Sequence, residues 1–273
     1  REKEIESFKP EEYWTITAEL QDKEKKFSPF KATLEKYKGK KCKIGSKEQA
    51  DAALAALAAG TYEVASVKKS VTKSHAPAPF TTSTLQQDAS NKLGMTAPET
   101  MLMAQHLYEG IDIEGVGHVA FVTYIRTDST RISSDAQAAA REHIAATYGE
   151  EYLPAKLNIY ASKKGAQDAH EAIRPIDLSR TPEAVKKLLD KKHYNVYKLI
   201  YERFIASQMT EALYDSMQAE IANGDYTLKA SGKALKFAGY TVVWQDAKSG
   251  EEEEGKGLLP PCLLYTSDAA DEL

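Results

Sequence analysis

Hydrophobic and polar positions change their spacing several times along the chain, and these changes separate β-rich from helical parts. The alternation in WTITAEL at residues 14–20 predicts a half-buried strand, which follows the end of a helix in residues 1–13. Ser46, with Gln49 three residues later, predicts a capping box for a helix through ADAALAALAA. Residues 61–68 favour a second strand.

The middle of the chain is mostly helical and has strands on both sides. A Lys-, Ser- and Pro-rich run at 69–81 predicts a linker and a domain boundary. Thr84, Thr96 and Ser134 each cap a predicted helix, and residues 118–125 form a short strand. The later elements are helices at 182–190 and 193–208 and strands at 214–222, 226–231 and 235–244, with turns at Asn223-Gly224 and Ser231-Gly232. The pattern indicates an α+β protein in which a helical domain is inserted into a β-rich one.

The composition supports a folded protein with a sizeable core. Of the 273 residues, 42% are hydrophobic and 9% aromatic, which excludes wholesale disorder. No apolar run approaches the roughly 18 residues of a membrane span, and no signal peptide is visible. Cys42 and Cys262 make neither a disulfide framework nor a zinc site, so we expect a reducing cytoplasm.

The charge balance bears on possible partners. The chain has 36 Lys and Arg against 40 Asp and Glu, a formal net charge of −4, which argues weakly against a nucleic-acid protein. Uneven placement of the basic residues keeps that class open. The basic runs at 163–164 and 186–192 favour solvated helix faces over nucleic-acid contacts.

Both ends of the sequence indicate a fragment. The chain opens on Arg1, and CLLYTSDAADEL at 262–273 fits no preceding pattern. We interpret this tail as a translated sequencing adaptor and exclude it from the fold. We therefore expect the natural protein to continue beyond about residue 260.

The segment TYIRTDSTRIS, residues 123–133, carries the first candidate chemistry. Tyr124 lies near a strand end, and Arg126 leaves an extended segment on the same face. A tyrosine hydroxyl is a poor nucleophile at neutral pH, because the ordinary pKa of tyrosine is about 10. A neighbouring guanidinium favours the phenolate and binds phosphate, which suits attack on a phosphodiester. Asp128 and Ser129 can position the loop by hydrogen bonding to nearby backbone. The alternative is an ordinary strand tyrosine followed by a turn.

The segment QDAHEAIRP, residues 167–175, carries the second group of candidate catalytic residues. On a helical turn His170 and Arg174 share a face. His170 can relay a proton or donate to a phosphate, and Arg174 can hold a phosphate or pair with Glu171. The alternative is a structural histidine beside a surface salt bridge.

Other catalytic motifs are missing from the sequence. It contains no Walker loop, no Rossmann glycine fingerprint and no HExxH. Asp112 and Glu114 come closest to an acidic pair for Mg²⁺, but they follow a helix stop and precede a Gly-rich turn, so they are interpreted as turn residues.

Three separated motifs together resemble one family. PFTTSTLQQDASNKLGM, TYIRTDSTRIS and QDAHEAIRP, in this order, are similar to the bacterial DNA topoisomerase I family of type IA enzymes. The resemblance runs from the first residues to about Trp244. Ile125 follows the tyrosine where topoisomerase III relatives usually have proline, which favours the topoisomerase I branch.

The resemblance implies residue roles. Tyr124 matches the nucleophile that forms a 5′-phosphotyrosine link, Arg126 the arginine at the scissile phosphate, and His170 a histidine of DNA binding and proton handling. Thr127, Asp128, Glu171 and Arg174 are carried over only as motif neighbours, and of these Thr127, Asp128 and Arg174 are included in the expected DNA contacts. The implied activity is ATP-independent relaxation of negatively supercoiled DNA by single-strand cleavage, strand passage and religation.

The resemblance also implies an architecture. The family forms a four-domain torus, of which this chain would supply part. The expected pieces are the end of a helix of the active-site-adjacent domain at 1–13, a β-rich arch at 14–80 and 180–250, and a helical domain carrying the tyrosine at 81–179. The acidic Toprim domain that binds Mg²⁺ is absent, so we expect no metal ligands here and no activity from the fragment alone.

The resemblance further implies a monomer in the cytoplasm, associated with the nucleoid, whose partner is the single-stranded part of negatively supercoiled duplex. Two other classes stay open beside it. One is a non-catalytic scaffold for single-stranded DNA, with salt-dependent binding and no covalent adduct. The other is a helical interaction module without nucleic-acid affinity.

Overall fold

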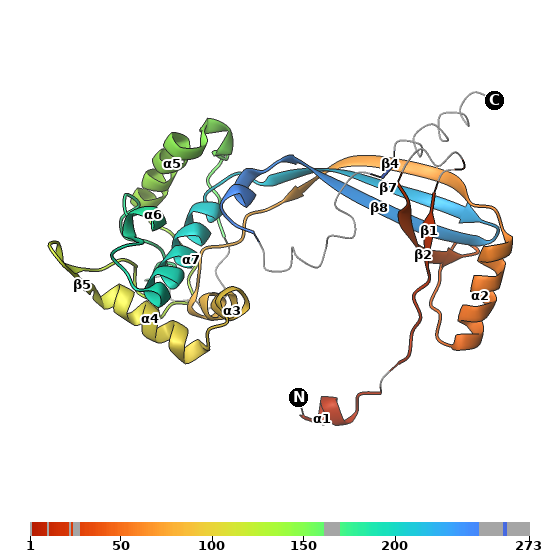
Figure 1. Ribbon diagram of the computed structural model, residues 1–273, viewed down its shortest axis with the longest axis horizontal. Helices are drawn as coiled ribbons and strands as arrows, with labels where there is room; N and C mark the ends of the chain where they lie inside the picture. Colours follow the sequence, from red (N-terminus) through yellow and green to blue (C-terminus); the bar gives the residue numbers. More distant parts are fainter. Residues whose placement is uncertain are drawn as a thin grey trace. The chain divides into compact units, whose positions relative to one another are not determined.

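Strands and helices are segregated in the protein (Figure 1). The computed structural model describes residues 2–9, 11–21, 23, 28–160, 170–245 and 259–260. These residues divide into two compact units. Unit 1 contains the described residues of Arg1–Thr72, Tyr214–Ala234 and Glu252–Leu273. Unit 2 contains the described residues of Lys73–Leu213 and Leu235–Glu251. The predicted α+β class is confirmed.

Most of unit 1 is an antiparallel sheet with the strand order β1-β2-β8-β7-β4, and β3 pairs with β2. The strands are β1 (Thr17–Leu20), β2 (Phe30–Tyr37), β3 (Lys40–Lys41), β4 (Glu63–Ser74), β7 (Ala212–Asn223) and β8 (Tyr226–Phe237). Thr17 pairs with Thr33 between β1 and β2, and Tyr37 pairs with Tyr226 between β2 and β8. The long strands β4, β7 and β8 lie side by side (Figure 1).

Helix α2 (Lys47–Ala59) covers the core of unit 1. Its buried Ala50, Ala53 and Leu57 belong to the same apolar cluster as Met217 and Leu228 of the sheet. Alanine on the helix face allows close approach of the helix to the strands. The cluster excludes water from the middle of the sheet and provides the hydrophobic stabilisation of this unit.

The two ends of α2 are fixed by side chains. Ser46 accepts a hydrogen bond from the Gln49 backbone, as the sequence predicts. At the other end the buried Asn223 amide donates to the Leu57 carbonyl at 3.0 Å. A Cβ on Gly60 would lie 1.9 Å from the Asn223 side-chain oxygen, so only glycine permits this approach.

Unit 2 is built around α7 (Lys191–Ser207), whose inner face is buried from Val196 to Ser207. Helices α3 (Thr82–Leu93), α4 (Ala97–Glu109) and α6 (Pro182–Val185) pack against it. The remaining elements are α1 (Glu2–Glu6) in unit 1 and, in unit 2, α5 (Ser134–Tyr148), the 3₁₀ helices η1 (Glu150–Tyr152) and η2 (Gly239–Val242), and the hairpin of β5 (Ile111–Ile113) and β6 (Gly117–Val119).

Some helix boundaries follow the predicted signals, but the predicted helix 182–190 is reduced to α6, which ends at Val185. The N-cap of α4 is Thr96, as predicted. The N-cap of α3 is Thr81 rather than Thr84, and the N-cap of α5 is Ser133 rather than Ser134. Thr84 instead completes a capping box with Thr81. A cap needs an extended backbone ahead of the helix, and Thr81 and Ser133 have it.

Several strand predictions are wrong. The predicted linker 69–81 contains the end of β4, which lies at the sheet edge, where polar side chains can face water and no apolar period is needed. Ser231-Gly232 lies inside β8 and makes no turn, and the predicted strand 235–244 gives way to η2. The predicted strand 118–125 is reduced to β6 and an isolated bridge at Val122.

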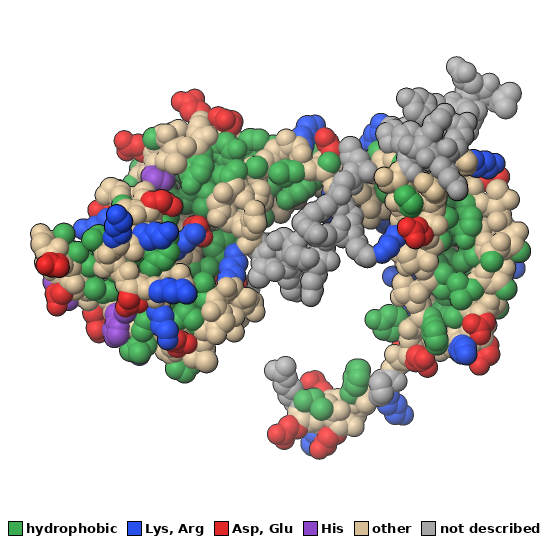
Figure 2. All heavy atoms as spheres, viewed as in Figure 1, with side chains coloured by type: hydrophobic (Ala, Val, Ile, Leu, Met, Phe, Trp, Pro, Cys, Tyr) green, Lys and Arg blue, Asp and Glu red, His purple; other side chains and the backbone are tan. Residues whose placement is uncertain are grey.

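The predicted domain ranges 14–80, 81–179 and 180–250 stay a prediction. In the structure residues 180–213 belong to unit 2, together with α3, α4 and α5. Charged side chains of both signs are interspersed over these helices on the face drawn in Figure 2. Within the described part of the chain, no helix has the length and apolar character needed to cross a membrane.

Candidate active site around Tyr124

Three chain segments meet beside Tyr124 in unit 2. They are the start of α3, the segment 121–131 and the segment 170–176. Ile173 donates its backbone N–H to the Phe80 carbonyl at 2.8 Å, and Thr123 donates to the Arg174 carbonyl at 2.9 Å. The three motifs that carry the resemblance are thereby brought together by backbone hydrogen bonds.

Thr82 holds the chain on the C-terminal side of the tyrosine. Its hydroxyl donates to the Ile125 carbonyl at 2.7 Å and accepts the Thr127 N–H at 2.9 Å. The Thr82 N–H donates to the Thr127 carbonyl, also at 2.9 Å. One side chain thus satisfies two backbone groups in a loop that has no strand ladder of its own.

Thr123 holds the N-terminal side. Its hydroxyl donates to the Ala172 carbonyl at 2.9 Å and accepts the Arg174 N–H at 3.0 Å. On the other side of Tyr124, the Ile125 side chain is 1% exposed. Tyr124 therefore lies between two anchored neighbours, and its own side chain is left to point outward.

The Tyr124 ring is in contact with two other rings and is still 40% exposed. The His170 ring lies 5.4 Å away, centroid to centroid, and is tilted by 34°. The Tyr108 ring from the end of α4 meets it edge-on at 5.5 Å. The contacts limit the directions that the phenol can take while water and ligands still reach it.

The loop after Tyr124 alternates between buried and exposed residues. Ile125 and Thr127 are buried, whereas Arg126 and Asp128 are exposed. Arg126 is therefore on the solvent side of the loop together with Tyr124, as the extended spacing predicts. A guanidinium is suited to binding an anion through its paired N–H donors.

Side-chain turns fix the rest of this loop. The Thr127 hydroxyl accepts the Ser129 N–H at 3.0 Å, and the Ser129 hydroxyl accepts the Arg131 N–H at 3.1 Å. Ser129 therefore positions the loop, as predicted, and Thr127 does so as well through its own side-chain turn.

The segment 170–176 is extended rather than helical, so the predicted helical face shared by His170 and Arg174 is wrong. The backbone of this segment bonds to Phe80, Phe121 and Thr123 instead of forming the i to i−4 bonds of a helix. Residues 167–169 of the predicted motif lie outside the described residues.

Arg174 pairs with Glu171, one of the two roles that the sequence left open. Its Nε and Nη2 lie 2.9 and 2.8 Å from Glu171 Oε2, and both side chains are more than three-quarters buried. Burial acts to raise the pKa of the Glu171 carboxyl, but Arg174 and hydrogen bonds with Ser133 outweigh it and leave this pKa lowered. The contact of Arg174 with DNA stays a prediction.

The described residues include no group of three or more His, Cys, Asp or Glu side chains that could hold a metal ion. Glu171 is occupied by Arg174, and Asp112 pairs with His118 at 2.8 Å in the β5–β6 hairpin. The residues described here therefore do not fit a Mg²⁺ site.

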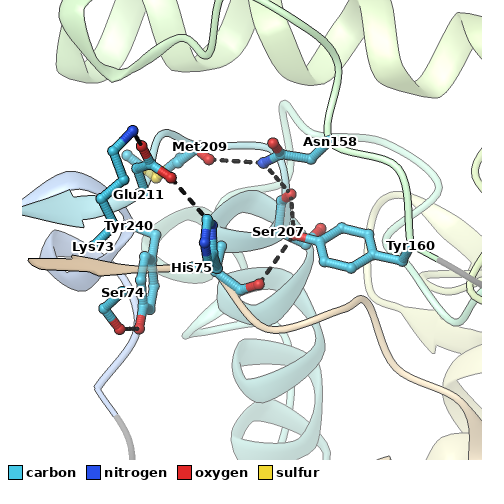
Figure 3. Close-up of polar contacts among 10 residues, drawn as sticks. Lys73, Ser74, His75, Asn158, Tyr160, Ser207, Met209, Glu211 and Tyr240 are labelled. Atoms are coloured by element: carbon cyan, nitrogen blue, oxygen red, sulfur yellow. Dashed lines mark hydrogen bonds and ion pairs between the residues drawn. The ribbon is translucent and has the colours of Figure 1, made fainter.

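A second polar cluster lies at the end of α7 (Figure 3). The Asn158 amide donates to the carbonyls of Ser207 and Met209 at 3.0 and 2.8 Å, and the Tyr160 hydroxyl donates to Ser207 at 2.8 Å. The last carbonyls of a helix lack partners within the helix, and these side chains supply them. Glu211 forms ion pairs with Lys73 and His75 in the same cluster.

A cavity of about 460 Å³ borders this cluster, with His75, Asn158, Tyr160 and Glu211 in its wall. These polar groups are engaged with the helix end or with each other. Burial raises the pKa of the Tyr160 hydroxyl to about 12. The cluster is thus explained as a structural support of α7.

Comparisons with known proteins point to one class, the DNA topoisomerases. A family model described as DNA topoisomerase matches residues 1–263. The solved structure of full-length topoisomerase I from Thermotoga maritima is similar to this chain, with a TM-score of 0.74 and 34% sequence identity. The chain belongs to the bacterial type IA DNA topoisomerase family. The match covers 95% of this chain and 39% of the Thermotoga maritima chain.

The sequence pointed to Tyr124, Arg126 and His170 but missed the side chains that position them. Thr82 and Thr123 stand inside the conspicuous motifs, yet their partners lie more than forty residues away. Tyr108 has a helical spacing typical of a core residue, but its ring contacts Tyr124. No local signal identifies such contacts.

We expect Thr82→Val to destabilise the protein. Valine keeps the shape of threonine but leaves the Ile125 carbonyl and the Thr127 N–H without their partner, which costs about 1–3 kcal/mol of the free energy of unfolding. Urea unfolding followed by circular dichroism measures it. Thr17→Val, at an exposed position, is the matched control and should change stability by less than about 0.5 kcal/mol. Equal effects of the two substitutions would refute the anchoring role.

We expect Tyr160→Phe to weaken the alkaline sensitivity of the fold. The raised pKa of Tyr160 means that the unfolded tyrosine ionises first, so stability is complete below about pH 10 and is lost between about pH 10 and 12. Phenylalanine should lower the slope of the unfolding free energy against pH by the equivalent of roughly one bound proton. Unfolding free energies from pH 8 to 12 test it. Tyr13→Phe, whose ring is 80% exposed, should leave the slope unchanged.

Proposed function

We propose that this chain supplies the strand-cleaving tyrosine of an enzyme that relaxes negatively supercoiled DNA without ATP. The observation that carries the proposal is the state of Tyr124, which is exposed, anchored on both sides, and held against His170. Family membership and the likeness to Thermotoga maritima topoisomerase I support it. The Glu171–Arg174 pair and both threonines serve this geometry as scaffold.

The proposed chemistry is transesterification. Tyr124 Oη attacks a backbone phosphorus atom, the Oη–P bond forms, and the P–O3′ bond breaks. The phenol loses its proton and the departing 3′-oxygen gains one, so protons balance. The 5′-phosphotyrosine keeps the energy of the phosphodiester, and attack by the 3′-hydroxyl restores the strand and the phenol. Before this religation, the other strand passes through the break, which changes the linking number of the DNA.

Two neighbours assist in this proposal. Arg126, exposed on the tyrosine side of the loop, binds the scissile phosphate and balances the charge that develops on it. His170, whose ring faces Tyr124, donates to the phosphate or carries a proton to or from the reacting oxygens. Thr127, Asp128 and Arg174 complete the proposed DNA contacts.

Mg²⁺ is proposed to come from a Toprim domain outside this chain, where it would help to position phosphates. The described residues offer no metal cluster, and no step above passes through the ion. We therefore propose that the chain alone binds single-stranded DNA without relaxing supercoils. The working protein is proposed to be a monomer in the cytoplasm, at the nucleoid.

We expect Tyr124→Phe to abolish relaxation and to preserve DNA binding. The change removes only the nucleophilic oxygen, and the ring contacts with His170 and Tyr108 remain. The test uses Thermotoga maritima topoisomerase I in which residues 1–245 of this chain replace the matching segment. With Mg²⁺ and without ATP this chimera should relax plasmid, and the variant should be slower by at least about 10³-fold. Single-strand affinity should stay within about twofold.

Tyr108→Phe is the matched control, because it removes a hydroxyl from the adjacent ring and should leave relaxation intact. Denaturant added during turnover should trap a covalent DNA adduct on the peptide that contains Tyr124. Relaxation by the Tyr124→Phe chimera would disprove the nucleophile. Salt-dependent binding with no adduct and no relaxation would favour the non-catalytic scaffold.

A further inference from the structure

The β2–β3 hairpin of unit 1 carries the densest group of lysines in the described chain. Lys38, Lys40, Lys41 and Lys43 are all exposed. With Tyr37 and Cys42 they line a pocket of about 410 Å³. We call Tyr37, Lys38, Lys40, Lys41 and Lys43 the hairpin surface. None of these residues takes part in the site around Tyr124, which lies in unit 2.

The hairpin presents these side chains from a fixed backbone. Lys38 and Gly39 at the turn both have positive φ, 50° and 74°, as in the tight turns that match the twist of a hairpin. Lys38 donates its N–H to the Asp225 carbonyl, and Cys42 donates to the Glu35 carbonyl, both at 2.8 Å. A rigid scaffold lowers the entropy lost when side chains bind a ligand.

Three of the lysines carry charge that the fold does not balance. Lys36 and Lys38 pair with Glu220 and Asp225 at 2.6 and 3.7 Å. Lys40, Lys41 and Lys43 form no ion pair with any residue that the structure describes. Neighbouring like charges repel each other, so the group costs stability in the isolated chain. An anion at the pocket would remove that cost.

An edge-strand role explains the lysines only in part. Charged side chains on an edge strand prevent pairing with other strands. Strand β3 has only two residues, and both are lysines. The further lysines at 38 and 43 are more than is needed to protect so short an edge. The edge role also predicts no aromatic group among the cations.

Tyr37 provides such a group. Its ring is 40% exposed and packs on Tyr226 at 4.8 Å, and the Lys38 ammonium lies 5.4 Å from its centroid. The Tyr226 contact holds the ring in place. Cations that follow a phosphate backbone, combined with a ring on which a base stacks, are the usual means of binding a single strand. A duplex offers no unstacked base to Tyr37.

We propose that the hairpin surface binds single-stranded DNA, with Lys40, Lys41 and Lys43 on backbone phosphates and Tyr37 stacked on one base. The choice of DNA as the natural strand rests on the proposed function. The binding itself does not, because it needs neither Tyr124 nor cleavage.

The test measures binding of a fluorescein-labelled 20-nucleotide oligothymidylate to this full chain by anisotropy, from about 50 to 200 mM salt. The triple variant Lys40→Gln, Lys41→Gln, Lys43→Gln should bind at least about tenfold more weakly at the lowest salt. The slope of log K against log salt should become shallower by about 2, since each lost phosphate contact on a single strand removes about 0.7.

The matched control is Lys186→Gln, Lys187→Gln, Lys191→Gln, which removes the same charge from exposed positions of unit 2. It should lower affinity by less than about threefold. Equal losses in the two triple variants would reduce the effect to net charge and overturn the proposal, as would no binding by the unmodified chain. Circular dichroism verifies that both variants fold.

A second pair of variants tests the stacking. Tyr37→Leu should weaken binding by about fivefold or more, and Tyr37→Phe should leave it unchanged, because phenylalanine keeps the ring. An abasic oligonucleotide should not distinguish Tyr37→Leu from the unmodified chain. Unchanged oligothymidylate binding by Tyr37→Leu overturns the stacking.

Two further arms separate this proposal from other outcomes. In the first, binding is measured without Mg²⁺ and detects no cleavage, so failure of the cleavage hypothesis would not affect the result. Vesicles of phosphatidylcholine with 30% phosphatidylserine should not bind through these lysines at about 150 mM salt. Binding to vesicles in preference to the oligonucleotide would identify a membrane surface instead and overturn the proposal.

Discussion

Two threonine hydroxyls set the position of Tyr124, and the rest of the site depends on them. Thr82 and Thr123 each accept one backbone N–H and donate to one carbonyl on segments distant in sequence. A buried polar backbone group without a partner lowers the stability of the fold. Each hydroxyl therefore keeps its two segments together by satisfying a backbone group on each of them. The tyrosine lies between these anchors, and its side chain is exposed. Its exposure follows from the hydrogen bonds of its neighbours.

The same hydrogen bonds leave Arg174 and Arg126 in different surroundings. Arg174 belongs to the anchoring segment, and Glu171 neutralises it within a mostly buried pair, so its charge serves the scaffold. Arg126 belongs to the anchored loop, with a buried residue on each side, and is exposed beside Tyr124. The Arg174 guanidinium already donates to Glu171 and to the Pro175 carbonyl, so it keeps fewer donors for a phosphate. The alternation of burial in the loop therefore places Arg126 on its exposed side.

The sequence predicted what is encoded locally. The caps at Ser46 and Thr96 and the glycines that end the helices act within a few residues, and they stand within one or two positions of the observed boundaries. The extended form of 170–176 and the length of β4 depend on partners far along the chain, so local spacing misled the prediction there. The motif residues Tyr124 and Arg126 were found because they are neighbours. Tyr108 was missed because its ring reaches Tyr124 only after α4 has folded.

The net charge of −4 argues weakly against a nucleic-acid partner, and the structure explains why it is a poor guide. Salt screens charges beyond about 10 Å at 0.1 M, so a phosphate responds to the groups near it and not to the chain total. Glu220 and Asp225 neutralise the lysines beside the hairpin, and Arg174 is neutralised by Glu171. The remaining exposed cations include Arg126 beside Tyr124 and the lysines around the hairpin pocket. Local pairing inside the fold, more than composition, determines where this acidic protein can attract a phosphate.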